Sequence, residues 1–326
     1  MRVKVTFNVA FIIKKIIQYF FTIFAVIIIT FLLVNLAPGD PTYVLVGEVG
    51  DEQFIKAARE RLGLDRPIHE RLAIYLSNVL RGDLGYSYLR SESVANLIVS
   101  RIPATLLLVL TAMFVSALVG IIVGTVAAAR GGGLDLSLSL LSLFGISIPY
   151  FWLGQIILIV FAVYLGWFPI GGMVTIGAGY QGLEYVLDVL RHLFLPVMTL
   201  ATFNIAYTTK ITRGSVLESL TQDYITTARA KGVSERRVVF VHALRNALIP
   251  VVTYTGFNTG VLLVGAILTE TVFAWPGMGS LLYDSIRLRD YPVVLGVFIY
   301  GSIIIIIANL IVDIVYGFLD PRIRVK

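Results

Sequence analysis

Histidine is the first residue type to examine for catalysis, and this sequence contains only three. His69, His192 and His242 lie far apart along the chain, and no H-E-x-x-H or G-x-S-x-G motif accompanies them. The absence of cysteine excludes disulfides, thiolate metal sites and cysteine nucleophiles. A G-x-x-x-x-G-K-[ST] nucleotide loop is also missing. We therefore predict no catalytic, cofactor-binding or metal-binding residue in this chain.

Basic residues gather in the segment 210–247. They are Lys210, Arg213, Arg229, Lys231, Arg236, Arg237 and Arg245. In membrane proteins, lysine and arginine are enriched in short loops on the cytoplasmic side. The segment is therefore expected in the cytoplasm.

Capping residues divide this segment into two helices. Asp223 is the expected N-cap of a helix over Tyr224–Lys231, and Gly232 suits the left-handed position after a helix end. Ser234 is expected to cap the next helix, with Glu235 in its first turn. The first helix would then be a short rigid projection that can transmit motion.

The side chains on this projection leave two interpretations open. Arg229 and Lys231 lie beside the small residues Ala228 and Ala230. Anionic lipid can hold basic side chains next to a membrane span. Alternatively, the helix that carries them is a rigid projection that transmits motion.

A second set of candidates consists of polar side chains inside apolar segments. Within 193–209 and 248–269, the candidates for lining a path through the membrane are Thr199, Asn204, Thr208, Thr253 and Asn258. Polar groups in hydrocarbon need hydrogen-bond partners or water. These residues either bond neighbouring helices together or line a translocation path, and both interpretations remain open.

Composition places the chain in a membrane. Of its 326 residues, 57% are hydrophobic and only 14% are charged, whereas a soluble domain has about 25% charged residues. The formal net charge of +6 could indicate nucleic acid, but in so apolar a chain it reports orientation in the membrane instead. The span centres carry no fixed charge, which argues against a proton-coupled pump or a voltage sensor. Active transport would therefore need a separate motor.

Charge-free stretches of about 20 residues predict six membrane-spanning helices. They are Ile16–Ala37, Ile102–Ala129, Leu136–Phe168, Leu193–Thr209, Leu248–Thr269 and Tyr291–Val312. The third stretch is long enough for two helices, but two crossings would place the basic segment outside. One crossing places that segment and both termini in the cytoplasm, as the positive-inside rule requires. Pro149 is expected to bend this third span.

The remaining boundaries follow from these spans. Residues 1–38 hold the N-terminus and the first span, 39–101 form an external segment, 102–318 form the core, and 319–326 form a cytoplasmic tail. Helical spacing predicts two helices in the external segment, Asp51–Leu62 and Pro67–Leu80, with a turn at 82–85. This segment is either a cap on the outer membrane face or a docking surface for an external partner.

Several motifs identify the family that this sequence resembles. The run Y-I-T-T-A-R-A-K-G-V-S-E-R-R from Tyr224 to Arg237, followed by H-A-L-R-N-A-L-I-P from His242 to Pro250, resembles the coupling loop of binding-protein-dependent ABC importers. The similarity is greatest to the dipeptide, oligopeptide and nickel branch, and to its first permease. Importers in general open this loop with Glu-Ala-Ala, which this chain lacks. Further matching runs are L-A-P-G-D-P at 36–41, L-G-L-D-R-P at 62–67, G-D-L-G-Y-S at 82–87 and E-T-V-F-A-W-P-G-M-G at 270–279.

The resemblance implies a type I importer permease at the cell membrane. Its expected partners are a second homologous permease, two cytoplasmic ATPase subunits that carry ATP and Mg, and an external solute-binding protein. The resemblance implies that 223–234 docks into the ATPase, with Arg229 and Lys231 meeting acidic groups. It further implies an outer gate at Glu270 and the turn Trp275-Pro276-Gly277.

The cargo stays open at this point. Peptides are expected, with oligosaccharides or nickel as alternatives, because permeases of this branch resemble one another across cargoes. A channel that works without ATP is the alternative from another functional class, suggested by the polar stretches at 193–209 and 248–269 in a chain without a motor.

Overall fold

The computed structural model describes residues 9–36, 42, 56, 59–60 and 63–319, and helices dominate these ranges. Among the described residues, five helices are long and apolar enough to cross a membrane, and a bent helix pair supplies a sixth candidate. The five belong to α1 (Val9–Leu36), α5 (Val94–Arg130), α8 (Gly182–Leu220), α11 (Leu244–Leu263) and α14 (Tyr291–Leu319). An all-α polytopic membrane fold is thus confirmed.

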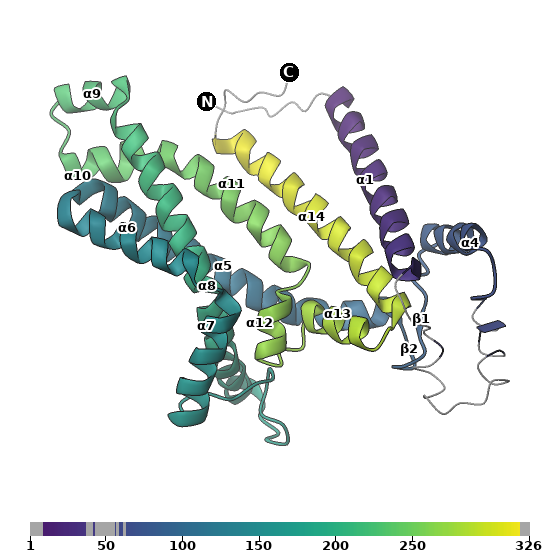
Figure 1. Cartoon of the computed structure of the whole chain (residues 1–326). Helices are drawn as coiled ribbons and strands as arrows, with labels where there is room; N and C mark the ends of the chain where they lie inside the picture. The colour runs from purple at the N-terminus through teal and green to yellow at the C-terminus, as the bar shows by residue number, and fades with distance from the viewer. Residues whose placement is uncertain (1–8, 37–41, 43–55, 57–58, 61–62, 320–326) are drawn as a thin grey trace.

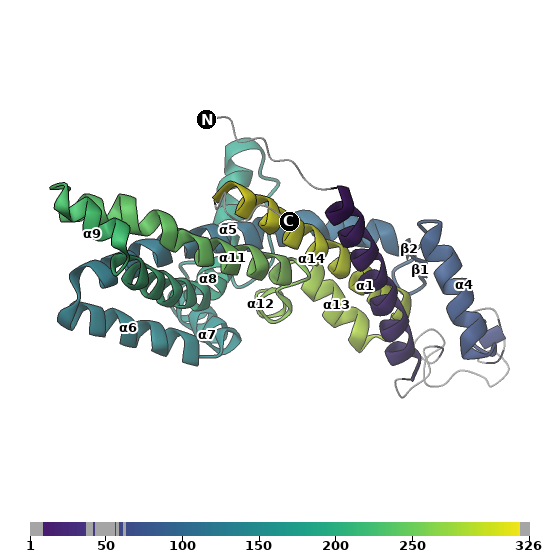
Figure 2. The same cartoon turned by 90° about the horizontal axis from the view of Figure 1, so that it is seen from above.

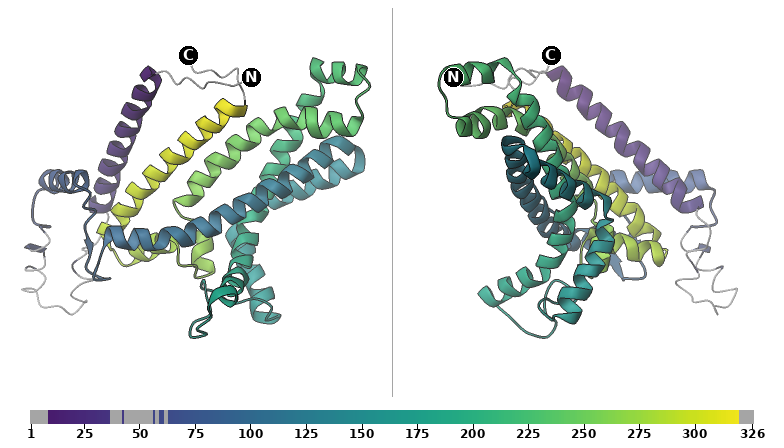
Figure 3. Two further views of the ribbon diagram at one scale, coloured as in Figure 1. Left: turned by 180° about the vertical axis from the view of Figure 1, so that it is seen from behind. Right: turned by 60° about the vertical axis from the view of Figure 1, so that its left-hand side comes forward.

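Four of these helices form a row, and α5 crosses it. In Figures 1 and 2, α8, α11, α14 and α1 lie side by side in that order, and each packs against the next. α5 runs across one face of the row and contacts α8, α11 and α14, as the rear view in Figure 3 shows. With 39 residues, α8 is about 58 Å long, roughly twice the thickness of the hydrocarbon core. It therefore extends well beyond the predicted span Leu193–Thr209.

The third predicted span is broken. It consists of α6 (Gly132–Ser147), α7 (Tyr150–Ile157) and a π-helical turn over Leu158–Tyr164, and its two parts meet at 93°. Ile148 is extended, with ψ of 127°, because the ring of Pro149 disfavours helical backbone in the residue before it. The expected bend at Pro149 is confirmed. Because the bend is so large, α6 and α7 are two separate helices, and each of them packs against α8.

Small residues bring α5 and α8 into close contact. A Cβ atom added at Gly124 would lie 2.6 Å from the carbonyl oxygen of Thr209 and 2.7 Å from Cβ of Thr212. Gly120 meets Thr208 in the same way, at 2.5 Å from its Cβ. The Gly120-x-x-x-Gly124 spacing thus serves helix packing inside one chain.

The fifth predicted span, Leu248–Thr269, is wrong at its end. α11 stops at Leu263, and a short helix, α12 (Ile267–Val272), follows after a break. Gly265 has a φ of +143° and packs directly on Gly279, where any Cβ would clash at 2.7 Å, so the chain turns there. At its other end, α11 contains Pro250 within the helix and is preceded by α10 (Glu235–Arg237) and a π-helical turn, η2 (Val238–Ala243).

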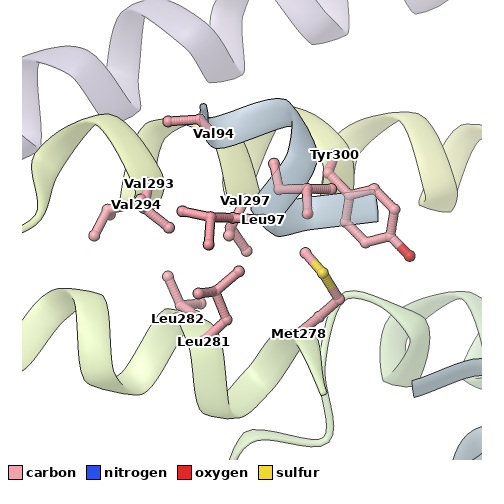
Figure 4. Close-up of a cluster of buried hydrophobic side chains, with 10 residues drawn as sticks. Val94, Leu97, Met278, Leu281, Leu282, Val293, Val294, Val297 and Tyr300 are labelled. Atoms are coloured by element: carbon pink, nitrogen blue, oxygen red, sulfur yellow. The ribbon is translucent and has the colours of Figure 1, made fainter. Parts of the chain in front are cut away.

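A hydrophobic cluster joins the start of α5, the start of α14 and α13 (Met278–Arg287). Figure 4 shows its side chains pointing toward one another from these three helices. Val94, Met278, Val293 and Val297 are fully buried. Burying a side chain of this size contributes roughly 1.5–3 kcal/mol. The cluster therefore fixes α13 beneath the helix row.

The segment 39–101, which was expected to be external, contains one helix of eight or more residues and a small hairpin among its described residues. α4 (Ile68–Leu80) follows Pro67 as predicted, and Gly82 and Gly85 adopt positive φ in the expected turn. Strands β1 (Tyr86–Ser87) and β2 (Glu92–Ser93) then pair antiparallel, which the sequence did not predict. Most of the helix expected at 51–62, and the tail from 320 onward, lie outside the described residues.

Candidate coupling site and polar cluster

The helix α9 (Asp223–Ala230) forms one extremity of the molecule. Figures 1 and 3 show it projecting beyond the membrane helices, on the side where α1 begins and α14 ends. The chain reaches it from the long α8 and leaves through α10 and η2. The predicted projecting helix is present.

Two side chains anchor α9 to the rest of the chain. Ile225 is fully buried, and Ala228, one turn later, is nearly so. They pack into a cluster with residues from α5, α8, η2 and α11, namely Ala128, Val216, Val238, Val239, Ala243 and Ala247. The remaining α9 side chains are exposed. We had no expectation for Ile225, although its spacing of three residues from Ala228 is the signal of a buried helix face.

Gly232 terminates α9 as predicted. Its φ is +74°, a region that residues with a Cβ rarely adopt. Its amide donates to the carbonyl of Arg229 at 2.9 Å, and the amide of Val233 donates to the carbonyl of Ala228 at 3.2 Å. These two bonds form the Schellman arrangement, which satisfies carbonyls at a helix end. The direction in which the chain leaves α9 is therefore set by the backbone conformation at Gly232.

The caps differ from the prediction. Gln222 occupies the N-cap of α9, and Asp223 is the first helical residue, where its charge favours the helix dipole. Ser234 does hold the N-cap position of α10, with Glu235 in the first turn, but its side chain makes no capping bond. Asp223 as an N-cap is therefore wrong, and the boundary shifts by one residue.

A salt bridge spans the turn at Gly232. Arg229 Nη2 lies 2.6 Å from Glu235 Oε1, and Arg229 Nε lies 3.2 Å from Glu235 Oε2. The hydrogen bond from this carboxylate raises the pKa of Arg229 above its ordinary value. Arg229 is thus engaged within the chain, while Lys231 is exposed and has no ion pair in the described part of the molecule.

The exposed surface near α9 is partly apolar. Tyr224 is 39% exposed, and Phe240 and Val241 of η2 are also exposed. Aromatic side chains dominate the energetics of many protein interfaces. Phe240 and Val241 were not predicted, because their exposure depends on the π-helical turn, which the sequence pattern does not reveal.

An ion pair connects α8 to the start of α6. Arg213 donates from Nε and Nη2 to the two carboxylate oxygens of Asp135, the second at 2.6 Å. Asp135 lies in the first turn of α6. The same helix that leads into α9 is therefore tied to the broken third span.

The polar residues of α8 and α11 converge at one point. Asn204 Oδ1 accepts hydrogen bonds from Asn258 Nδ2 and from Tyr254 Oη, the latter at 3.1 Å. The ring of Tyr254 stacks on Tyr207 with centroids 5.1 Å apart. Asn204 is buried, whereas Asn258 and Thr253 are partly buried. Three polar side chains from two helices thus form one connected cluster.

Two of the predicted path residues lie elsewhere. Thr199 is fully buried against Gly154 of α7, and Thr208 is fully buried against Gly120 of α5. Both side chains are enclosed between helices of the same chain. Within this chain, helix packing, one of the two interpretations left open by the sequence, accounts for their burial, and their place on a path stays a prediction.

Glu270 is a buried structural contact rather than a surface residue. Its side chain is fully buried; Oε1 accepts from Thr105 Oγ1 at 2.9 Å and Oε2 accepts from the amide of Ser280 at 3.0 Å. Thr105 Oγ1 in turn accepts from the amide of Met278 at 2.8 Å. The carboxylate therefore joins α12, α13 and α5.

Burial and hydrogen bonds to α5 also hold the turn after α12. Trp275 is fully buried and donates from Nε1 to the carbonyl of Ala104 at 2.9 Å. Gly277 is buried beside the Glu270 carboxylate, and Pro276 is partly buried. These residues therefore tie the turn to α5, and the outer gate expected here stays a prediction.

Comparison with known proteins places this geometry in a family. Residues 116–325 match the family described as "Binding-protein-dependent transport system inner membrane component". Residues 8–109 match its N-terminal counterpart, "Binding-prot-dependent transport system membrane comp, N-term". The two matches cover nearly the whole chain.

Individual relatives are similar over almost their full length. The di/tripeptide transport system permease protein DppB of Pseudomonas aeruginosa is 43% identical, covering 93% of this chain and 95% of the relative. The glutathione transport system permease protein GsiC of Escherichia coli is 41% identical, and the oligopeptide transport system permease protein AppB of Bacillus subtilis is 38% identical, each covering 97% of this chain and 99% of the relative. The chain therefore belongs to the family of binding-protein-dependent transport system inner membrane components.

Proposed function

We propose that this chain is a membrane-spanning permease subunit of an ATP-driven ABC importer of di- or oligopeptides and forms half of the translocation path. The names of its relatives support peptides as the substrate class. The structural observation that carries the proposal is α9, an exposed helix whose one buried face is packed against the membrane helices. A partner that moves α9 can thereby move the helix bundle.

Its partners follow in part from the family. A component of binding-protein-dependent transport works with a solute-binding protein and with ATPase subunits. We propose in addition that it pairs with a second homologous permease and that two ATPase subunits carry the ATP and Mg. In this proposal the chain itself is no enzyme and needs no cofactor or nucleic acid.

The proposed mechanism is that of a type I importer. ATP binding closes the ATPase subunits, which displace α9 together with the exposed residues Tyr224, Ala230, Lys231, Phe240 and Val241 around it. Ile225 and Ala228 pass this displacement to α8 and η2, and the Arg213–Asp135 pair passes it on to α6. The path then opens outward to receive substrate, and hydrolysis resets it.

We place the path along the polar cluster of α8 and α11. Asn204, Thr253 and Asn258 are the residues proposed to line it, since they are polar and two of them are only partly buried. Glu270, Trp275, Pro276 and Gly277 are proposed to hold the outer end of α11 in place, because they link α12 and α13 to α5. If this region acts as an outer gate, we expect α12, α13 and these four residues to move together.

The orientation proposed is cytoplasmic for α9 and for both termini. α1 begins and α14 ends on the side of α9 (Figure 1), which agrees with an even number of crossings. The basic residues of 210–247 then lie inside, as the positive-inside rule requires.

The test is ATP hydrolysis by the reassembled complex in proteoliposomes. We expect a dipeptide, delivered by the solute-binding protein, to stimulate hydrolysis, and oligosaccharide or nickel to leave it unchanged. If oligosaccharide or nickel stimulated hydrolysis and the dipeptide did not, peptides would be refuted as the cargo. Solute flux through this chain without ATP would refute the importer role and support a channel.

A further inference from the structure

A cavity of about 520 Å³, open on one side, is lined by the last turns of α1, by α4, by the turn and hairpin that follow α4, and by the start of α14. These elements lie at the end of the molecule opposite α9 (Figure 2). The side chains that define its chemistry are Asn35, Arg66, Arg71, Tyr75, Arg289 and Asp290. None of these residues takes part in the coupling site or the polar cluster.

The inner wall of the cavity carries the guanidinium group of Arg71. Arg71 is partly buried and donates from Nη2 to Asn35 Oδ1, and in the described ranges no carboxylate forms an ion pair with it. Tyr75 contributes its ring to the wall and stacks on Phe31 with centroids 5.6 Å apart, whereas its Oη is buried away from the cavity. Arg71 therefore supplies the hydrogen-bond donors of this wall.

Among the described residues that line the cavity, the charge balance is positive. Arg66 and Arg289 add two cations to Arg71, and the acids of this described lining are Glu60 and Asp290. Asp290 is already engaged, since it accepts from Ser87 Oγ and from Arg90 Nη1, the latter at 2.9 Å. Within the described lining, three guanidinium groups therefore outnumber the one carboxylate, that of Glu60, which forms no ion pair with another described residue. Arginine prefers phosphate and carboxylate groups, which it binds with two parallel hydrogen bonds.

The position of the cavity indicates where such an anion comes from. Asn35 lies in the last turn of the candidate span Ile17–Leu36, at the depth where lipid headgroups begin. Leu33 and Leu36 on α1 are largely exposed, Leu36 at 72%, and offer an apolar surface for acyl chains. α4 carries Ile74 and Leu80 exposed as well, as expected of a helix at a membrane surface.

We propose that this cavity binds the phosphate group of a membrane phospholipid. Arg71 donates to the phosphate oxygens, Arg66 and Arg289 supply further positive charge at the rim, and the acyl chains lie along the exposed face of α1. The bound lipid would join α1 to α4 and the start of α14. The proposal does not depend on the substrate of transport, because it rests only on the position of the cavity at the end of a membrane span.

The test measures lipid retained by the full complex in native mass spectrometry. The complex is exchanged into detergent with phosphatidylglycerol or with a diacylglycerol of the same chains, which lacks the phosphate. The wild type is expected to retain phosphatidylglycerol and not diacylglycerol. Arg71→Gln should reduce the retained phosphatidylglycerol by about tenfold, because it removes a charge-assisted hydrogen bond.

The matched control is Arg81→Gln, which removes the same charge from the end of α4 outside the cavity lining. It should retain phosphatidylglycerol as the wild type does, and Arg71→Lys should restore part of the loss in Arg71→Gln. Equal retention by Arg71→Gln and wild type would overturn the proposal. Displacement of the lipid by soluble glycerol phosphate at equal concentration, or by a dipeptide, would overturn the assignment of a lipid as the ligand. ATPase activity of each variant complex is recorded separately, so that failure here is distinguishable from failure of the proposed function.

Discussion

Replacing Ile225 by alanine should uncouple transport from ATP hydrolysis. Ile225 is the one large buried side chain of α9, and the other buried residue of that helix is Ala228. Truncating a fully buried isoleucine to alanine costs roughly 2–5 kcal/mol. If about 3 kcal/mol of that cost falls on the contact between α9 and its cluster, the ratio of docked to undocked α9 falls by about 150-fold, since 1.4 kcal/mol corresponds to tenfold. The substitution changes no side chain of the membrane helices, so the contacts that these helices make with one another keep their residues.

The assay is peptide uptake and ATP hydrolysis by the same proteoliposomes, expressed as peptide transported per ATP. Ile225→Ala should lower this ratio by about tenfold or more, because an undocked α9 no longer passes displacement to α8. Ile225→Val, which costs about 0.5–1.5 kcal/mol, should lower it only slightly. Thr226→Ala, at the exposed neighbouring position, is the control and should match the wild type.

Hydrogen exchange of the α9 amides shows whether the helix has undocked. Faster exchange in α9, with unchanged exchange in α8, is expected for Ile225→Ala. If α9 exchanges faster while the peptide transported per ATP stays at the wild-type value, the coupling role of this contact is refuted.

Three other substitutions test separate parts of the account. Gly232→Pro should abolish ATP-driven uptake but leave membrane insertion normal. Proline fixes φ near −65° where the chain needs +74°, and it removes the amide that donates to the carbonyl of Arg229. The matched control for uptake is Gly214→Ala, at an α8 position where an added Cβ has no neighbouring atom within 4 Å. Gly124→Ala should destabilise the α5–α8 contact by roughly 1–3 kcal/mol and so lower the midpoint of thermal unfolding, because its Cβ would lie 2.6 Å from the carbonyl oxygen of Thr209. Gly133→Ala should leave the midpoint unchanged, because a Cβ there has no neighbour within 4 Å. Thr105→Val should lower the unfolding midpoint by removing the hydroxyl that serves both Glu270 and Met278, at a cost of about 1–3 kcal/mol, and Thr105→Ser should retain most of the stability. Wild-type uptake in Gly232→Pro, or unchanged midpoints in the other two, would contradict these assignments.

Local sequence patterns were sufficient for the features that depend on neighbouring residues. Long apolar stretches located the membrane helices, because crossing a bilayer needs about 20 apolar residues. Gly232 was identified as the end of a helix because few other residues adopt positive φ. Pro149 was identified as a bend for the equally local reason that its ring restricts the residue before it.

Features that depend on distant residues were not predictable. Arg213 and Asp135 are 78 residues apart, and nothing in either neighbourhood indicates the pair. Glu270 was expected at an outer gate, but its role depends on Thr105, 165 residues earlier. Thr199 and Thr208 are polar residues in an apolar stretch, as residues that line a path would be. Only the packing of α7 against Thr199 and of α5 against Thr208 shows that both side chains are enclosed between helices. The 93° angle of the broken span likewise depends on how α6 and α7 follow α8.

The central claim, that α9 is the contact with the ATPase, can be tested with a single thiol. The chain has no cysteine, so Tyr224→Cys introduces a unique reactive group on exposed α9. Tyr164→Cys, at an 81% exposed site in the π-helical turn after α7, is the matched control far from α9. With a short thiol-to-amine crosslinker, the account predicts that Tyr224→Cys links to an ATPase subunit in a nucleotide-dependent manner and that Tyr164→Cys does not. Absence of a link from Tyr224→Cys, or an equal yield from both positions, would contradict it.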